Sequence, residues 1–190
     1  MRHALVRFLS ILGHPYIFAP VVLTLNSLGQ NQPNAGVSFY YGLCIGVAIS
    51  LLAAITLVQI KRGHYSDFDI SNQIQRQNFY PIIISIILLI LVAAYIIEPD
   101  IHKIRHLLTS FLILSIAWPL NHYVKASMHS AFAIFLATIP IATSPLLSFT
   151  LGLIALGICW SRFELRKHSV KEIYFGCILG VMASVFDFNL

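Results

Sequence analysis

An apolar stretch that contains no Asp, Glu, Lys or Arg, residues 37–60, most constrains what this chain can fold into. A helix rises about 1.5 Å per residue, so a helix over this stretch is long enough to cross the roughly 30 Å hydrocarbon core of a bilayer. The stretch therefore predicts a membrane-spanning helix, and the rest of the chain has to be compatible with a membrane.

The composition extends this prediction to the whole chain. Hydrophobic residues make up 58% of the 190 residues, charged residues only 10%, and the mean hydropathy is +0.82. Soluble domains carry about 25% charged residues, so a membrane protein is favoured. The length suits one domain, residues 1–190. The net charge of +5 suits anionic lipid headgroups. No basic block interleaves with aromatic residues, so we expect no nucleic-acid partner, and no protein partner can be deduced.

Short polar loops divide the chain into about seven apolar segments. These are residues 5–28, 37–60, 81–97, 102–120, 130–142, 148–160 and 169–186. The segments at 130–142 and 148–160 are too short to cross a bilayer alone, so we expect their helices to continue into the flanking polar motifs. The predicted fold class is all-α, a multi-pass transmembrane helical bundle with about six to seven membrane segments.

The polar link between the last two segments carries a compact set of reactive side chains. Ser161 and Arg162 precede His168 by a few residues, and Glu172 follows it by four. If the chain is helical from residue 169, Glu172 lies on the same face as His168 and can accept the proton of one ring nitrogen. The other nitrogen is then available to attack a substrate. Arg162 provides a forked donor suited to phosphate oxygens.

The spacing S-R-x5-H-x3-E of these four residues resembles the third signature of the type 2 phosphatidic acid phosphatases. These membrane lipid phosphate phosphatases are relatives of the vanadium haloperoxidases. The family usually has Asp where this chain has Glu172, which is a conservative departure.

The loop between the fourth and fifth segments resembles the second signature of the family, P-S-G-H. Ser127 and His129 match the Ser and His, whereas Ala126 and Met128 replace the Pro and Gly. The Ser hydroxyl and the backbone N–H groups that open the next helix can still hold an anion.

The first signature, K-x6-R-P, is only half present. Arg76 matches the Arg, but Gln77 replaces the Pro and Asp69 stands where the Lys belongs. Lys125, two residues before Ser127, is a candidate for the missing cation. The resemblance covers residues 67–180, the motif-bearing core.

The resemblance implies a helical bundle and a metal-independent, cofactor-free phosphatase that works through a phosphohistidine. His168 would be the nucleophile, Glu172 would orient it, and His129 would be the general acid and then the base. The phosphoryl oxygens would be held by Arg76, Lys125, Ser127 and Arg162. The substrate would be a lipid phosphate monoester or diphosphate, such as phosphatidate, phosphatidylglycerophosphate or a polyprenyl diphosphate, in contact with membrane lipids.

Three other interpretations remain open. The chain could be a catalytically inactive membrane protein that retains an anion or lipid-headgroup site, because the first-signature Lys is absent. A small transporter would need polar residues in mid-span, and the segments are almost bare of them. His102 and His106 are four residues apart and could ligate a metal, although no third ligand is evident.

The distribution of Lys and Arg predicts the orientation. With seven crossings, the N-terminus and the three motif loops share one side, which carries all of the 12 Lys and Arg residues except Lys103 and Arg105. Setting aside Arg76, Lys125 and Arg162 as catalytic leaves the same bias, and short loops rich in these residues stay cytoplasmic. We therefore expect a multi-pass protein of a bacterial cytoplasmic membrane with the active site on the cytoplasmic face.

Overall fold

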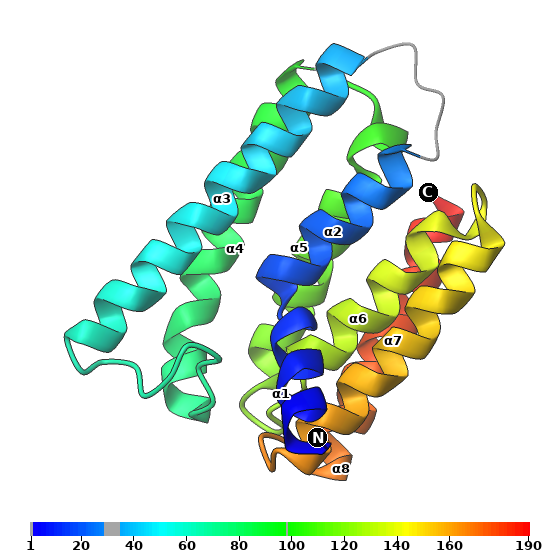
Figure 1. Cartoon of the computed structure of the whole chain (residues 1–190). Coiled ribbons are helices and arrows are strands. Elements are labelled where there is room, and N and C mark those ends of the chain that lie inside the picture. Colours follow the sequence, from blue (N-terminus) through cyan, green and yellow to red (C-terminus); the bar gives the residue numbers. More distant parts are fainter. Residues whose placement is uncertain (1, 29–34, 98) are drawn as a thin grey trace. The chain divides into compact units, whose positions relative to one another are not determined.

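The computed structural model describes residues 2–28, 35–97 and 99–190, and every regular element in these ranges is a helix (Figure 1). The elements are α1 (Arg2–Leu12), α2 (Pro15–Leu28), α3 (Ala35–Lys61), α4 (Gln73–Ile97), α5 (Ile101–Leu120), α6 (Met128–Thr138), the short 3-10 helix η1 (Ile139–Ile141), α7 (Pro145–Glu164) and α8 (Val170–Asn189). The all-α prediction is confirmed for this part of the chain.

Two of these helices, α4 and α7, are long and apolar enough to cross a membrane. A third candidate arises if α1 and α2 form one broken span, since they meet at a bend of 71°. Shorter apolar helical stretches occupy Ile45–Lys61, Ile104–Leu120 and Met128–Ile141. The described residues thus contain two to three candidate spans, which supports a membrane protein. The expected apolar segments lie largely within helices. Only two to three of the expected six to seven membrane spans are found as candidates among the described residues.

Two expected boundaries are wrong. Helix α4 begins at Gln73, eight residues before the expected start at Pro81, because the Asn72 side chain caps it. The Oδ1 atom of Asn72 accepts from the backbone N–H groups of Ile74 (2.9 Å) and Gln75 (3.2 Å). Arg76 is therefore helical rather than part of a loop. The second concerns the expected segment 5–28, which is divided between two helices, α1 and α2, that meet at a bend of 71°.

The chain divides into two compact units. Unit 1 is Met1–Ala35 with Ala126–Asn189, and unit 2 is Gly36–Lys125.

In unit 1, α6 packs against both α7 and α8, while α1 packs on α7 and α2 on α6. Two glycines allow α8 to approach α6 closely. A Cβ atom on Gly176 would clash with the carbonyl oxygen of Ser127, and one on Gly180 would lie 2.6 Å from the carbonyl oxygen of Ala131. Their spacing of four residues puts both on one face of α8. This close packing holds the start of α8 against the start of α6.

In unit 2, α4 packs against α5, and their polar ends are joined by side-chain hydrogen bonds. Asn121 donates to the carbonyl oxygen of Gln73 (3.1 Å) and to Oε1 of Gln77 (2.9 Å). Gln73 in turn donates to the carbonyl oxygen of Asn121 (2.5 Å). The start of α4, which carries Arg76, is thereby fixed to the end of α5, which leads into the loop that carries Lys125.

Candidate functional site

The second and third motifs meet at one end of unit 1. The backbone N–H of Ser127, just before α6, donates to the carbonyl oxygen of Glu172 in the first turn of α8 (2.9 Å). The end of α7 and the starts of α6 and α8 therefore gather at that end, which is the lower end of these three helices in Figure 1. Residues more than 40 positions apart in the sequence are brought together here.

The end of α7 turns sharply so that His168 can return toward this helix end. The N–H of Arg166 donates to the carbonyl oxygen of Phe163 (2.9 Å), and the N–H of Lys167 donates to that of Arg162 (3.1 Å). These two bonds form a Schellman motif, which requires a left-handed residue just after the helix. Arg166 takes that conformation with φ of 53°. Glycine is the usual residue there, so Arg166 holds the turn at some strain.

Helix α8 starts with a capping box formed by Ser169 and Glu172. The N–H of Glu172 donates to Oγ of Ser169 (3.3 Å), and the N–H of Ser169 donates to Oε2 of Glu172 (3.1 Å). The box fixes the carboxylate of Glu172 beside Ser169 and its neighbour His168. Helix α8 begins at Val170 rather than at residue 169, so His168 lies just outside the helix. The expected contact between His168 and Glu172 is present.

His168 lies against the carboxylate that the capping box holds. Its Nδ1 atom is 2.9 Å from Oε2 of Glu172, and its side chain is 1% exposed, compared with 22% for Glu172. A carboxylate accepts hydrogen bonds, so Nδ1 carries the proton and Nε2 carries the lone pair in the neutral ring. The arrangement favours the tautomer that the predicted nucleophilic role of Nε2 requires.

Arg162 is almost completely buried, at 1% exposure, in the last turn of α7. Its Nη1 atom donates to Oγ of Ser10 on α1 (2.7 Å). A second link ties the same two helices, because Nη2 of Arg2 lies 3.0 Å from Oε1 of Glu164. Burying a guanidinium is costly unless it is hydrogen-bonded, and an arginine in such a place is more often functional than structural.

Ser127 is fully buried and acts as the N-cap of α6. Its Oγ atom accepts from the N–H of Ser130 (3.4 Å) and from Oγ of Ser130 (3.0 Å). The hydroxyl thus has a structural partner in addition to the phosphate-binding role predicted from the sequence.

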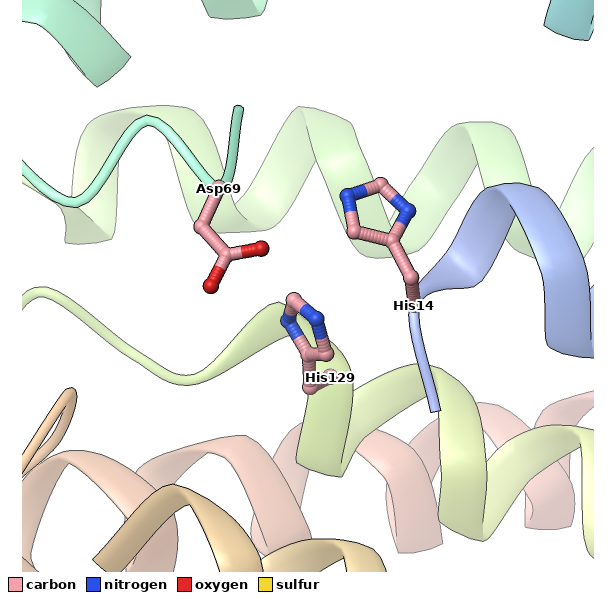
Figure 2. Close-up of side chains that lie close together, drawn as sticks. All are labelled: His14, Asp69 and His129. Atoms are coloured by element: carbon pink, nitrogen blue, oxygen red, sulfur yellow. The ribbon is translucent and has the colours of Figure 1, made fainter. Parts of the chain in front are cut away.

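His129, in the first turn of α6, is buried and lies against His14, a residue that the sequence analysis did not select. The two rings meet edge to face, with centroids 5.1 Å apart and planes at 87° (Figure 2). His14 lies between α1 and α2. A signal was present in the sequence, since Gly13-His14-Pro15 interrupts an apolar segment, but its significance depends on contact with a helix more than 100 residues away.

In unit 2, Arg76 and Lys125 converge on one turn. Nε of Arg76 donates to the carbonyl oxygen of Ile70 (3.2 Å), and Nζ of Lys125 donates to that of Ser71 (3.2 Å). Ile70 has φ of 48°, an uncommon conformation for a β-branched residue. The side chain of Asp67 stabilises the turn by accepting from the N–H (3.3 Å) and hydroxyl (3.0 Å) of Ser71.

The structure therefore brings five of the seven predicted site residues together in unit 1: Ser127, His129, Arg162, His168 and Glu172. Arg76 and Lys125 belong to unit 2, where they donate to the carbonyl oxygens of the neighbouring residues Ile70 and Ser71. Their roles in binding phosphate remain predictions.

No family model matches the chain, and no curated protein or solved structure matches it either.

Proposed function

We propose that this protein is a membrane-embedded, metal-independent phosphatase that hydrolyses a lipid phosphate monoester or diphosphate through a phosphohistidine intermediate. The observation that carries the proposal is the contact between the buried side chain of His168 and the partly exposed carboxylate of Glu172. The carboxylate of Glu172 contacts Nδ1 of His168 and is held in place by the cap of α8. This contact leaves Nε2 of His168 as the nucleophilic atom, on a side chain that is 1% exposed.

The first chemical step follows from this arrangement. Nε2 of His168 attacks phosphorus, and the bond from phosphorus to the leaving oxygen breaks. His129 donates a proton to that oxygen, so the lipid alcohol leaves as a neutral molecule, or the remaining phosphate leaves if the substrate is a diphosphate.

In the second step water attacks the phosphohistidine. His129, now deprotonated, takes a proton from that water, the bond from Nε2 to phosphorus breaks, and inorganic phosphate is released. Glu172 stabilises the positive charge on the ring of His168 while the phosphoryl group is attached.

Cationic and neutral hydrogen-bond donors can stabilise the negative charge that develops on the phosphoryl oxygens during this reaction. Arg162 is a buried, permanently charged donor beside the turn that holds His168, and the N–H of His168 itself donates to the carbonyl oxygen of Arg162 (3.3 Å). Such donors can neutralise equatorial phosphoryl oxygens as Mg²⁺ does in other enzymes.

The test is turnover by the detergent-purified protein on a panel of lipid phosphates in EDTA, with released phosphate as the readout. Release in EDTA that is lost in His168→Ala supports the proposal. Activity that vanishes in EDTA and returns with Mg²⁺ contradicts the mechanism.

The second candidate is a non-catalytic protein that binds phosphate headgroups. The capping of α6 by Ser127 favours it, since this hydroxyl already has a partner in Ser130. Binding of lipid phosphates without any release of phosphate identifies this alternative.

We also propose that six to seven segments cross the membrane and that the site faces the cytoplasm. Lys61, at the exposed end of α3, tests the orientation. In a variant without native cysteines, Lys61→Cys should resist a membrane-impermeant thiol reagent in intact cells and react after permeabilisation. Labelling in intact cells contradicts the cytoplasmic orientation and leaves the chemistry untouched.

A further inference from the structure

The break between α1 and α2 is built to lie against α7. Gly13 and His14 separate the two helices, which meet at 71°. A Cβ atom on Gly13 would lie 2.5–2.9 Å from side-chain carbons of Ile158 on α7. Only glycine lets the backbone at position 13 lie this close to Ile158. The backbone beside His14 is therefore fixed by packing within unit 1.

The same N-terminal segment is anchored to the residues that surround the candidate site. Ser10, in the last turn of α1, accepts from Arg162, and Arg2, in the first turn, pairs with Glu164. Both contacts join α1 to the final turn of α7. The position of His14 relative to the site is therefore defined by contacts at both ends of α1 and at Gly13.

The tautomer of His14 can be assigned from one hydrogen bond. Its Nδ1 atom accepts from the backbone N–H of Tyr16 (3.3 Å). An accepting Nδ1 atom places the proton of the neutral ring on Nε2, so His14 presents an N–H donor there. In its neutral form His14 thus presents an N–H donor at Nε2.

The distance between the two imidazoles suits one shared oxygen atom. A ring nitrogen of His14 lies within 4.8 Å of a ring nitrogen of His129. Two N–H···O hydrogen bonds of about 2.9 Å each span up to about 5.8 Å. A single oxygen can therefore accept from both rings at once.

We propose that His14 is a further substrate-binding residue, and that it donates to the leaving oxygen of the phosphate ester together with His129. This inference rests on the proposed function, because it assigns an oxygen of that reaction. His129 supplies the proton that the leaving oxygen acquires, and the Nε2–H of His14 stabilises the negative charge that builds up on the oxygen beforehand. After the alcohol departs, the attacking water takes the same place and contacts the same pair.

Two substitutions separate the donor from the packing of the ring. His14→Phe keeps an aromatic ring against His129 and removes the donor, whereas His14→Gln keeps an N–H donor near the position of Nε2. His3→Phe is the matched control, since His3 lies exposed on α1. All three proteins are compared with the wild type in detergent, with thermal unfolding as the check on folding.

The readouts are the affinity for orthovanadate and kcat/KM on two classes of phosphate ester. Bound vanadate mimics the five-coordinate phosphoryl group, and one of its apical oxygens occupies the place of the leaving oxygen. We expect His14→Phe to weaken vanadate binding roughly 10- to 100-fold, as the loss of a hydrogen bond to a charged group does. Alkyl phosphates should lose more kcat/KM than aryl phosphates, whose leaving oxygen needs less stabilisation.

The outcomes distinguish this inference from the proposed function. If the wild type hydrolyses phosphate esters and His14→Phe matches it on both readouts, the inference fails and the proposed function stands. If the wild type binds vanadate but releases no phosphate, the proposed function fails, and with it the assignment of a leaving oxygen. If His14→Phe does not fold, His14→Gln decides: near-wild-type values support the donor role, and losses as large for aryl as for alkyl esters contradict it.

Discussion

The end of unit 1 and the polar turn of unit 2 hold their cationic and titratable side chains in different ways. In unit 1, His168 contacts the side chain of Glu172, and Arg162 donates to the side chain of Ser10. These side-chain contacts fix the directions of the imidazole and the guanidinium. In unit 2, Arg76 and Lys125 donate to the carbonyl oxygens of Ile70 and Ser71.

The two regions differ in the local structure that the residues of each sequence motif form. The residues that resemble the third signature form a Schellman turn and a capping box that present one ring nitrogen. The resemblance to the first signature is poor, and there Arg76 and the candidate cation Lys125 donate to the carbonyl oxygens of a turn in which Ile70 has a positive φ. We therefore expect substitutions in unit 1 to reduce turnover far more than those in unit 2.

The largest effect should come from His168→Ala. Without the nucleophile, turnover should fall by at least about 10⁴-fold, as it does when other enzymes lose theirs. The measurement is phosphate release from the purified variant, with thermal unfolding as the control for folding. A variant that retains more than a few per cent of activity would remove His168 from its role and reverse the ranking of the two units.

Glu172→Gln should produce the next largest loss. Gln also completes a capping box, so α8 should still start at the same residue, but a neutral amide no longer holds the proton on Nδ1 of His168. We expect a roughly 10- to 100-fold fall in kcat, the usual range for a residue that orients a functional histidine. Unchanged thermal stability together with lower kcat separates orientation from capping. A loss of stability with normal kcat would reduce Glu172 to a helix cap.

Much of this architecture could be predicted from the sequence. The apolar runs predicted the helices: 37–60 lies within α3 and 148–160 within α7. The capping of α4 by Asn72 was missed because a polar stretch between apolar runs resembles a loop, and one side chain decides where the helix begins.

The candidate site could be predicted only where its residues are close in the chain. The pair of His168 and Glu172 is four residues apart, so spacing alone indicated the contact. Ser10 and His14 were missed because their partners, Arg162 and His129, lie more than 100 residues away. Neither a serine nor a histidine in an apolar segment indicates such a contact without the packing of α1 on α7 and of α2 on α6.

A smaller effect is expected for the two cations of unit 2. Lys125→Ala removes one donor and leaves Arg76 in place, so kcat/KM should fall about 10-fold or less, compared with a roughly 10²- to 10³-fold loss for Arg162→Ala. The double variant Arg76→Ala/Lys125→Ala tests whether the two act together, since they share one turn. Losses that exceed the product of the single variants would show coupling. A loss of kcat/KM for Lys125→Ala as large as that for Arg162→Ala would contradict the expected difference between the two units.

The smallest effect is expected from Arg166→Gly. Glycine takes the left-handed conformation of this position without steric cost, so the variant should gain about 1 kcal/mol in unfolding free energy. Because Arg166 is exposed, kcat should stay at the wild-type value. Thermal unfolding and phosphate release measured side by side check both statements. A loss of activity with a gain in stability would give this side chain a role in the reaction.

The most direct test of the central claim is to trap the phosphoenzyme. His129→Ala is mixed in EDTA with an aryl phosphate that carries a labelled phosphoryl group, because a good leaving group needs no acid while hydrolysis of the intermediate needs a base. We predict label bound to the protein that is released by acid and stable in base, as a phosphoramidate is, and that is absent from His129→Ala/His168→Ala. Label that persists in the double variant, or no label on His129→Ala when the wild-type protein releases phosphate from the same substrate, would contradict the account.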